Sequence, residues 1–260
     1  APTTLLAMTD SSVGGKTGVD LPQGKNLVGA FKQPAVVIMD PQVLSTLPLV
    51  EFRAGMAEVI KHAVIGEPGL FAELEALAPQ SPRTLPAVLL ARSLKVKIAI
   101  VEEDPYEQGR RAALNLGHTA GHALERLSDY SLRHGEAVGL GLLVAARLAA
   151  ELGWADRSLL ERLEALLAAW GLPLVPLPFP PEAVWEAMAH DKKRRGRALR
   201  WVLPRAVGQV EITDTVPQDL VIRVLSPRPS RGDAEGGLLR PEVGGGEGSC
   251  SLSPLGRGLG

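Results

Sequence analysis

Hydrophobic residues recur at helical spacing through most of the chain. Residues 51–65 place Met56, Val59, Ile60 and Val64 on one face, which predicts an amphipathic helix. Similar apolar patterns predict further helices at residues 69–78, 84–103, 134–153, 156–170 and 181–190. The pattern therefore predicts a mainly helical protein.

Strand patterns lie near the two ends of this helical region. The β-branched apolar run AVVIMD, residues 35–40, predicts a buried strand. Residues 200–216 alternate and carry several Val and Ile, which predicts a hairpin, and DLVIRVL (219–225) would close the fold. Residues 1–10 predict a short buried segment, and the VLSTLP run after Pro41 predicts a short helix or turn. The fold class expected from these elements is α+β, mainly helical.

A glycine-rich stretch, SSVGGKTGVDLPQGKN, spans residues 11–26 and predicts a loop. A Walker A phosphate loop would require glycine at position 10, which is Asp10, so that motif is excluded. Two interpretations remain. Flexible backbone with Lys16, Lys25 and Asn26 suits an anionic ligand, but the same composition is typical of a solvated loop.

The stretch RAALNLGHTAGH, residues 111–122, has an unusual polar pattern. Arg111, Asn115, His118 and His122 are spaced four, three and four apart, which on one helix forms a single polar stripe. Two glycines flank the histidines, and each costs about 1 kcal/mol relative to alanine inside a helix. We therefore expect a helix that brings these side chains to something that must approach closely.

Histidines are concentrated in the same part of the chain. Three of the five, His118, His122 and His134, fall within 17 residues. Histidines on two successive helices and a carboxylate from elsewhere would form a site with an open position, as in catalytic zinc sites. Glu58 is the best placed carboxylate by pattern, and imidazole with carboxylate suits Zn²⁺ or a similar divalent ion. Core or surface histidines are the alternative.

Three other charged groups also have two interpretations. Glu58 and Lys61 lie three residues apart, which taken alone is typical of a surface ion pair worth a few tenths of a kcal/mol. Lys97 lies in a strongly apolar predicted helix, so its ammonium either extends to solvent or is retained for a function. The basic cluster HDKKRRGR, residues 190–197, is typical of a solvated loop.

Composition narrows the classes of function. The formal net charge of −1 gives no electrostatic indication of a nucleic-acid or membrane partner. No signal peptide and no apolar run of about 18 residues is present, so we expect a cytoplasmic protein. The single Cys250 excludes an internal disulfide and a cysteine-based zinc site.

The two ends of the chain differ in kind. The first residue is alanine and lies in a stretch that already resembles folded structure, so we expect the N-terminal part of a longer protein to be missing. Residues 226–260 are rich in Gly, Pro, Ser and Arg without periodicity, which predicts a disordered tail.

Several blocks, taken in order, resemble the 3-dehydroquinate synthase family. They are TTLLAMTDSSVGGKTGVDLPQGKNLVGAF, AGMAEVIKHAVI, NLGHTAGHALE, HGEAVGLG and MAHDKK, within roughly residues 3–225. The resemblance implies an N-terminal nucleotide-binding domain, a mostly helical C-terminal domain, and an active site in the cleft between them. Residues 1–45 would then be the end of a Rossmann-like NAD-binding domain, and residues 46–225 the helical domain that binds metal and substrate. The family's glycine-rich dinucleotide fingerprint is absent from this chain.

The resemblance also implies roles for individual residues. It makes Glu58, His118 and His134 the ligands of one divalent metal ion, zinc or cobalt, and makes His122 a site residue that is not a ligand. The residues implied to surround the substrate are Asp10, Lys16, Asn26, Lys61, Lys97, Arg111, Asn115 and one of Lys192 and Lys193. The positions implied to lie near NAD are Thr3, Thr4, Lys25, Thr46 and Glu51, with Asp10 and Lys16 shared between substrate and nicotinamide.

The implied activity converts 3-deoxy-D-arabino-heptulosonate 7-phosphate into 3-dehydroquinate and phosphate, a step of the shikimate pathway. It proceeds by NAD-dependent oxidation, phosphate elimination, reduction and intramolecular aldol closure, so NAD is regenerated, and the full-length enzyme is expected to be a homodimer. Lys97, Arg111 and Asn115 suit a substrate that carries both phosphate and carboxylate.

Several alternatives remain. One is another sugar-phosphate cyclase, similar to 2-deoxy-scyllo-inosose or 2-epi-5-epi-valiolone synthase. The others are a metal-dependent polyol or alcohol dehydrogenase that releases NADH, and an inactive truncated remnant that only binds metal.

Overall fold

The computed structural model describes most of the chain up to Ser226. The described residues are 1–21, 24–77, 84–174, 179–193 and 199–226, and the side chains of residues 20, 24–27 and 190–193 are left out of the description. The predicted disordered tail beyond Ser226 lies outside these residues, as does most of the basic cluster at 190–197.

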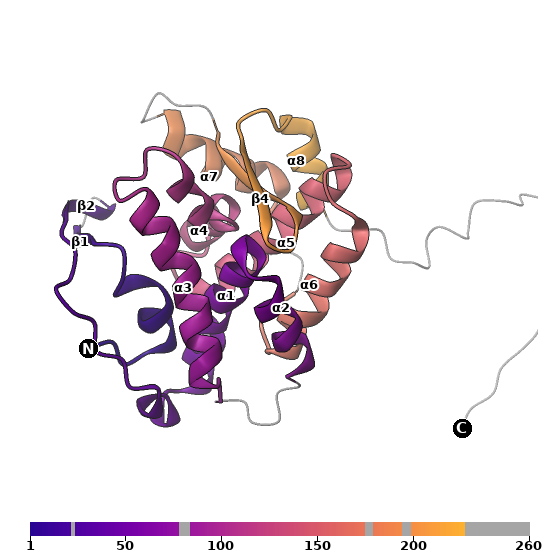
Figure 1. The fold of residues 1–260 in the computed structure, drawn as a ribbon. Coiled ribbons are helices and arrows are strands. Elements are labelled where there is room, and N and C mark those ends of the chain that lie inside the picture. Colours follow the sequence, from indigo (N-terminus) through magenta and orange to yellow (C-terminus); the bar gives the residue numbers. More distant parts are fainter. Residues whose placement is uncertain (22–23, 78–83, 175–178, 194–198, 227–260) are drawn as a thin grey trace, which may run out of the picture. The chain divides into compact units, whose positions relative to one another are not determined.

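Eight helices make up most of the described chain (Figure 1). They are α1 (Leu49–Gly66), α2 (Pro68–Ala76), α3 (Ala87–Glu103), α4 (His118–Leu127), α5 (His134–Glu151), α6 (Arg157–Ala169), α7 (Pro181–Lys193) and α8 (Gln218–Leu225). The helices predicted from apolar spacing at 51–65, 69–78, 84–103, 134–153, 156–170 and 181–190 are therefore confirmed.

Helices α1 and α5 form the centre of the hydrophobic core (Figure 1). Every residue from Ala54 to Ile65 in α1, and from Ala137 to Ala146 in α5, is buried. Helix α1 packs against α2, α3 and α5, and helix α5 also packs against α4, α6 and α8. A helix that is buried on all sides carries apolar residues on all sides, which explains why neither helix has a wide polar face.

Glycines allow the central helices to touch through their backbones. A Cβ atom on Gly135 of α5 would lie 1.8 Å from the carbonyl oxygen of Ala54 in α1. A Cβ atom on Gly141 would lie 1.8 Å from the carbonyl oxygen of Gly117, just before α4. Any side chain at either position would separate the helices, so both crossings require glycine.

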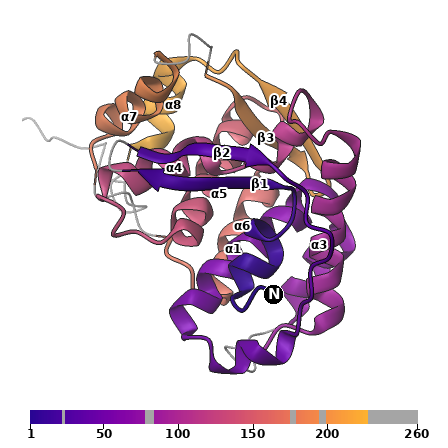
Figure 2. The same cartoon turned by 90° about the vertical axis from the view of Figure 1, so that its left-hand side faces the viewer.

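The glycine-rich stretch forms a hairpin, so the predicted loop is wrong there. Strands β1 (Lys16–Leu21) and β2 (Gly24–Phe31) pair antiparallel, with Val19 opposite Val28 (Figure 2). Gly18 pairs with Gly29, where an added Cβ would meet the carbonyl of Thr17 at 2.0 Å. The glycines therefore permit close strand pairing instead of marking flexible backbone.

The buried strand predicted at residues 35–40 is also wrong. The segment is irregular, and the exposed fractions of Val36 and Ile38 are 73% and 67%. A strand needs a neighbouring strand to satisfy its backbone groups, and none of the described strands pairs with this segment. The short helix expected after it is confirmed as a 3-10 helix at Pro41–Thr46.

Residues 111–122 do not form one helix, contrary to the prediction. A 3-10 helix covers Arg110–Asn115, and the chain then turns at Gly117, whose φ of +79° is left-handed, before α4 begins at His118. The left-handed conformation is open to glycine at little cost, which explains why the helix breaks there. The four polar residues therefore lie on two elements instead of one stripe.

The C-terminal part of the described chain contains the predicted hairpin. Strand β3 (Trp201–Ala206) pairs antiparallel with β4 (Gln209–Thr213), and α8 follows and packs on α5 and α7. None of the helices in the described ranges has the length and apolar content that crossing a membrane would require.

Candidate metal and substrate site

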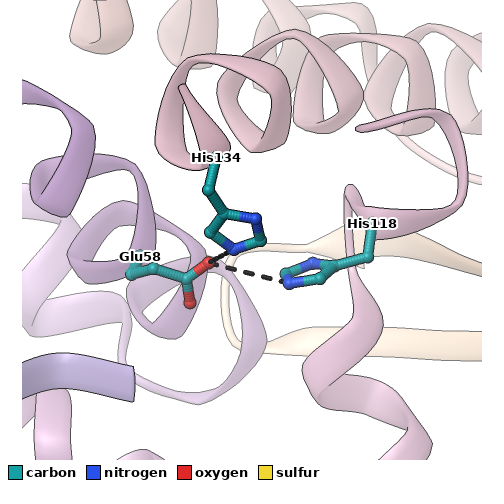
Figure 3. A group of neighbouring side chains, drawn as sticks. All are labelled: Glu58, His118 and His134. Atoms are coloured by element: carbon teal, nitrogen blue, oxygen red, sulfur yellow. Dashed lines mark ion pairs between the residues drawn. The ribbon is translucent and has the colours of Figure 1, made fainter. Parts of the chain in front are cut away.

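Three predicted metal ligands meet at the junction of three helices (Figure 3). Glu58 comes from the middle of α1, whereas His118 and His134 are the first residues of α4 and α5. The Nε2 atoms of His118 and His134 lie 3.8 Å and 3.6 Å from the same oxygen, Oε1 of Glu58. One candidate ligand atom from each residue lies within 4.8 Å of the other two, which suits a single bound cation.

The polar atoms of these residues fit a divalent cation. Glu58 is fully buried, and Oε1 faces the two Nε2 atoms without a hydrogen bond of ordinary geometry, whereas Oε2 lies against the Lys61 ammonium. Burying a carboxylate in that state is costly, and a cation would offset the cost. His118 places Nδ1 3.1 Å from the carbonyl oxygen of Leu116, so Nδ1–H can donate there and leave the Nε2 lone pair facing Glu58.

Glu58 and Lys61 form a buried ion pair, so the interpretation as a surface pair is wrong. The Lys61 ammonium lies against Oε2 of Glu58, and both side chains are shielded from solvent. Breaking such a pair is far more costly than breaking an exposed one. A cationic group therefore lies directly beside the candidate metal position.

The pKa values of the site follow from burial and neighbouring charge. Burial alone would raise the pKa of the Glu58 carboxyl, but Lys61, His134 and His118 outweigh it and hold the pKa well below its usual value. Burial, reinforced by Lys61, lowers the pKa of His118 to about 3. Burial opposes protonation of His134 as well, yet its contacts with Glu125 and Glu58 raise its pKa to about 9. Glu58 is thus held as a carboxylate and His118 as a neutral imidazole, the forms that bind metal.

Lys97 and Asp10 extend the site towards the N-terminal segment. Lys97 is only 5% exposed, so the interpretation that its ammonium reaches solvent is wrong. Its Nζ lies 2.6 Å from Oδ1 of Asp10 and also donates to the Asp10 carbonyl. One oxygen of Asp10 lies within 4.8 Å of candidate ligand atoms of Glu58 and His62. Residues predicted from distant parts of the chain therefore meet around Glu58.

Burial lowers the pKa of the Lys97 ammonium, although Asp10 opposes the shift. Burial acts to raise the pKa of Asp10, and Lys61 and Lys97 outweigh it so that the pKa is lowered. The shift of Lys97 therefore follows from its burial, and that of Asp10 from two neighbouring cations.

Arg111 is buried and contacts the backbone of two loops. Its guanidinium donates to the carbonyl oxygen of Gly14 at 2.5 Å and to that of Pro105, and it lies 5.8 Å from the ring centroid of Phe31. Arg111 is only 3% exposed, so it is not the surface arginine that a helical pattern alone allows. It joins the segment before the first hairpin to the turn after α3.

Lys16 and Asn115 meet at Glu107, a residue that the sequence analysis did not identify. Asn115 Nδ2 donates to Oε1 of Glu107 at 2.9 Å, and the Lys16 ammonium pairs with Oε2. Burial would raise the pKa of Glu107, and these two partners outweigh it so that the pKa is lowered. Glu107 has a φ of +57°, which is uncommon for a residue with a side chain.

Asp104 holds the turn that carries Glu107 and Arg111. Its carboxylate accepts hydrogen bonds from the backbone amides of Gln108, Gly109 and Arg111, at 2.9, 2.8 and 3.0 Å. An aspartate that accepts several amides and is followed by Pro and Gly is typical of a tight turn. This local signal was available in the sequence, but it does not reveal where Glu107 points.

His122 lies beside the candidate ligands. Its ring centroid is 5.2 Å from that of His118 and 6.2 Å from that of His134. His122, Glu125 and His134 also form a second group whose candidate ligand atoms lie within 4.8 Å of one another. Glu125, which the sequence analysis did not identify, places Oε1 3.5 Å from Nδ1 of His134.

Three of the residues predicted to lie near NAD have polar contacts within the described chain. The Thr4 hydroxyl accepts from the amide of Ala7 at 3.1 Å, and the Thr46 hydroxyl donates to the carbonyl oxygen of Val43 at 3.1 Å. Glu51 pairs with Arg133 at 2.9 Å. Each of these side chains has a local partner, and Thr3 is exposed. The side chains of Lys25, Asn26, Lys192 and Lys193 lie outside the described residues.

Comparisons with known proteins agree on one family. The model of the 3-dehydroquinate synthase C-terminal domain matches residues 55–194, and the model of the N-terminal domain matches residues 1–54. The 3-dehydroquinate synthase of Nostoc punctiforme is 49% identical over 86% of this chain and 64% of its own length. That of Xanthomonas campestris pv. campestris is 50% identical, with the same coverage. The chain therefore spans about 64% of the length of these relatives.

Solved structures of related cyclases have a similar fold. A 2-epi-5-epi-valiolone synthase from Streptomyces hygroscopicus, with NAD⁺ and Zn²⁺ bound, has a TM-score of 0.78 and 27% identity over 86% of this chain and 64% of its own. A 2-deoxy-scyllo-inosose synthase complexed with carbaglucose-6-phosphate, NAD⁺ and Co²⁺ has a TM-score of 0.77 and 29% identity, with the same coverage. These likenesses support the mainly helical α+β fold class expected from the sequence.

Proposed function

Because this chain belongs to the 3-dehydroquinate synthase family, we propose that the protein containing it converts 3-deoxy-D-arabino-heptulosonate 7-phosphate into 3-dehydroquinate and phosphate. The observation that carries the proposal is the buried Glu58 carboxylate, faced by two histidine Nε2 atoms and lying beside the ammonium of Lys61. A cation held by these three ligands would have cationic side chains next to it. That arrangement suits an anionic substrate that also coordinates metal.

The metal would be held by Glu58, His118 and His134, and zinc or cobalt suits these ligands. When bound, the ion would supply a Lewis acid that polarises a substrate oxygen and lowers the pKa of its hydroxyl. The helices contribute rigidity, since two of the ligands are first residues of helices whose backbones touch their neighbours.

The cationic side chains would bind the phosphate and carboxylate of the substrate. Lys61 and Lys97 are buried and each pairs with one carboxylate in the described chain, Glu58 or Asp10. A dianionic group entering between them would gain charge-assisted hydrogen bonds of about 1.5–3 kcal/mol each. Arg111 and Asn115, on the 3-10 helix after α3, would orient the substrate. His122 would lie beside the metal, and Lys16 would contact the substrate from the hairpin.

We propose NAD as the cofactor because both related cyclase structures contain NAD⁺. The proposed division of the chain is that residues 1–45 belong to the nucleotide-binding domain and residues 46–225 to the metal- and substrate-binding domain. A homodimer and a cytoplasmic location are part of the same proposal.

Sequence identity favours this activity over the related cyclisations. The chain is 49–50% identical to 3-dehydroquinate synthases and 27–29% identical to the two cyclases of other specificity. Buried cations near two separate carboxylates also suit a substrate with two anionic groups. A dehydrogenase that releases NADH, or a remnant that only binds metal, would not require buried cations at both Glu58 and Asp10.

The proposal is tested by measuring products with the protein that carries this chain. We expect phosphate release and 3-dehydroquinate formation from 3-deoxy-D-arabino-heptulosonate 7-phosphate, with NAD and Zn²⁺ added and no net NADH. His118→Ala should abolish stoichiometric zinc binding, measured by elemental analysis, and with it the turnover. Phosphate release only from sugar phosphates that lack a carboxylate would identify another cyclase. Net NADH formation would identify a dehydrogenase, and zinc binding without turnover a non-catalytic remnant.

A further inference from the structure

His134 lies between two carboxylates that face opposite sides of its ring. Its Nε2 lies 3.6 Å from Oε1 of Glu58, and its Nδ1 lies 3.5 Å from Oε1 of Glu125. One imidazole can bind a cation through only one of these nitrogens while the other donates a hydrogen bond. The position of Glu125 therefore bears on which nitrogen faces the candidate metal.

The fold places Glu125 there through α4. Glu125 follows His118 by seven residues, which is two helical turns, so both side chains lie on the same side of α4. A Cβ atom on Gly121, between them, would lie 3.1 Å from the carbonyl oxygen of Ala137, which shows how closely α4 and α5 pack at this point. Helix α4 thus supplies one ligand directly and a partner for the ligand on α5.

Glu125 is also buried, with an exposed fraction of 6%. A carboxylate in that environment requires a donor or a cation, and the Nδ1 of His134 is within reach. His118 has a comparable arrangement, since its Nδ1 faces the carbonyl oxygen of Leu116 at 3.1 Å. The two histidines are therefore oriented in the same way, one by a neutral acceptor and the other by an anionic one.

We propose that Glu125 is a positioning residue for the metal site. It accepts a hydrogen bond from Nδ1–H of His134, which fixes the tautomer and ring orientation that direct the Nε2 lone pair at the ion shared with Glu58 and His118. Carboxylates in this relation to a metal-bound histidine raise its basicity, and their loss weakens metal binding by about 10–100-fold. This inference rests on the proposed metal site and adds a residue outside the ligand set.

Zinc affinity of the metal-stripped protein tests the role. Wild type should bind one equivalent of Zn²⁺ in competition with a chromophoric chelator. Glu125→Gln keeps the shape of the side chain and removes its charge, and it should bind one equivalent about 10–100-fold more weakly. Glu164→Gln is the matched control: Glu164 is a partly buried carboxylate on α6, paired with Arg147 at 3.0 Å, and its removal should leave zinc affinity unchanged.

Three outcomes would overturn the inference. They are equal affinity in wild type and Glu125→Gln, an equal loss in Glu164→Gln, and two equivalents in wild type of which Glu125→Gln loses one. The last would make Glu125 a ligand of a separate ion with His122. Failure of wild type to bind zinc at all would instead refute the proposed function, so the two failures are distinguishable.

A second measurement keeps the test independent of whether Glu125→Gln folds. Nitrogen-15 NMR of histidine in the zinc-bound wild type reports which ring nitrogen carries a proton. We expect His134 to be protonated at Nδ1 and bound to zinc through Nε2. Coordination through Nδ1 would exclude Glu125 as its acceptor.

Discussion

The helical core that carries the candidate ligands differs sharply in packing from the N-terminal hairpin and the segment after it, residues 16–40. Residues around Glu58 in α1 are buried on every side, and both histidine ligands begin helices that touch the core through glycine. In residues 16–40, by contrast, Val19, Val28, Val36 and Ile38 are all more than half exposed. Apolar side chains therefore have partners in one region and lack them in the other within the described chain.

The difference follows from how helices and strands complete their backbone hydrogen bonds. A helix completes its hydrogen bonds within its own segment, and its apolar face needs only a neighbouring helix, which this chain supplies. A strand completes its hydrogen bonds with another strand, and the apolar segment at residues 35–40 has none beside it in the described chain. An apolar pattern thus predicts burial reliably only where its partners belong to the same chain.

Two buried cations connect the regions. Lys97 on α3 holds Asp10, and Arg111 after α3 holds the carbonyl oxygen of Gly14. These charge-assisted contacts add to apolar packing, because Leu5 and Met8 of the same N-terminal segment are fully buried in the core. Substitutions in the core, in these connections and in the exposed segment should accordingly have decreasing effects.

The largest effect is expected from Gly135→Ala in α5. The new Cβ atom would lie 1.8 Å from the carbonyl oxygen of Ala54, so α1 and α5 must separate at His134. We expect a loss of about 3 kcal/mol in the free energy of unfolding, measured with urea, and weaker zinc binding. Gly139→Ala is the matched control, because its Cβ would make an ordinary 3.7 Å contact with Leu167. It should be neutral or stabilise by up to about 1 kcal/mol; equal losses at both positions would contradict the close crossing.

Arg111→Ala should have the next largest effect, because it removes one of the two cationic connections between the regions. It leaves the carbonyl oxygens of Gly14 and Pro105 without their donor, which should cost about 1–3 kcal/mol of stability in addition to any loss of phosphate release. The loss is expected because Arg111 is only 3% exposed and both acceptors are backbone groups. The neighbouring Arg110 is 63% exposed and pairs with exposed Glu103, so Arg110→Ala should change stability very little. Similar unfolding midpoints for the two variants would mean that the contacts of Arg111 with Gly14 and Pro105 do not contribute to stability.

A smaller effect on stability is expected from His134 in the helical core, and this effect should depend on pH. The pKa of His134 rises from 6.5 to about 9 in the folded, metal-free protein, so the folded state favours its proton. Its stabilising contribution is fully present below about pH 6.5 and is lost as the pH rises through about 9. With chelator present, the difference in melting temperature between wild type and His134→Gln should therefore be greater at pH 6 than at pH 10. A difference that grows with pH would contradict the contacts of His134 with Glu58 and Glu125.

The smallest effect is expected in the exposed N-terminal segment. Ile38→Val should change the free energy of unfolding by less than about 0.5 kcal/mol, because Ile38 is 67% exposed. The same substitution at fully buried Ile60 in α1 should cost about 1 kcal/mol. Equal costs, measured by urea unfolding of both variants, would show that the segment is packed in solution and would remove the contrast between the regions.

The sequence predicted the helices well because their apolar spacing is local. It did not predict the break at Gly117. The sequence does not show which glycine will adopt a left-handed backbone, because that depends on the packing of the neighbouring helices. Gly117 and Gly121 were expected to permit a close approach, and the structure shows that α5 is what approaches.

Site residues could be predicted where they follow from residue type and position on a helix. They could not be predicted where they depend on the conformation of a turn. Residue type and element made Glu58, His118, His122 and His134 candidates, and the family resemblance selected three of them as ligands. Glu125 was overlooked, although its seven-residue spacing from His118 placed it on the same side of the helix. Glu107 gave no such signal, because its position depends on a left-handed backbone in the turn held by Asp104. Its contacts with Lys16 and Asn115 cross separate elements and appear only in three dimensions.

The backbone contacts at Gly135 and Gly141 have a consequence for how the metal site forms. They fix the positions of α1, α4 and α5 without a metal ion. The candidate ligands should therefore form a preorganised site that needs little ordering on binding. Small zinc-binding domains gain their fold from the metal, and chelators unfold them. Here the hydrophobic core determines the fold, so an ion bound at the candidate site should be removable, or exchangeable between zinc and cobalt, without unfolding the three helices.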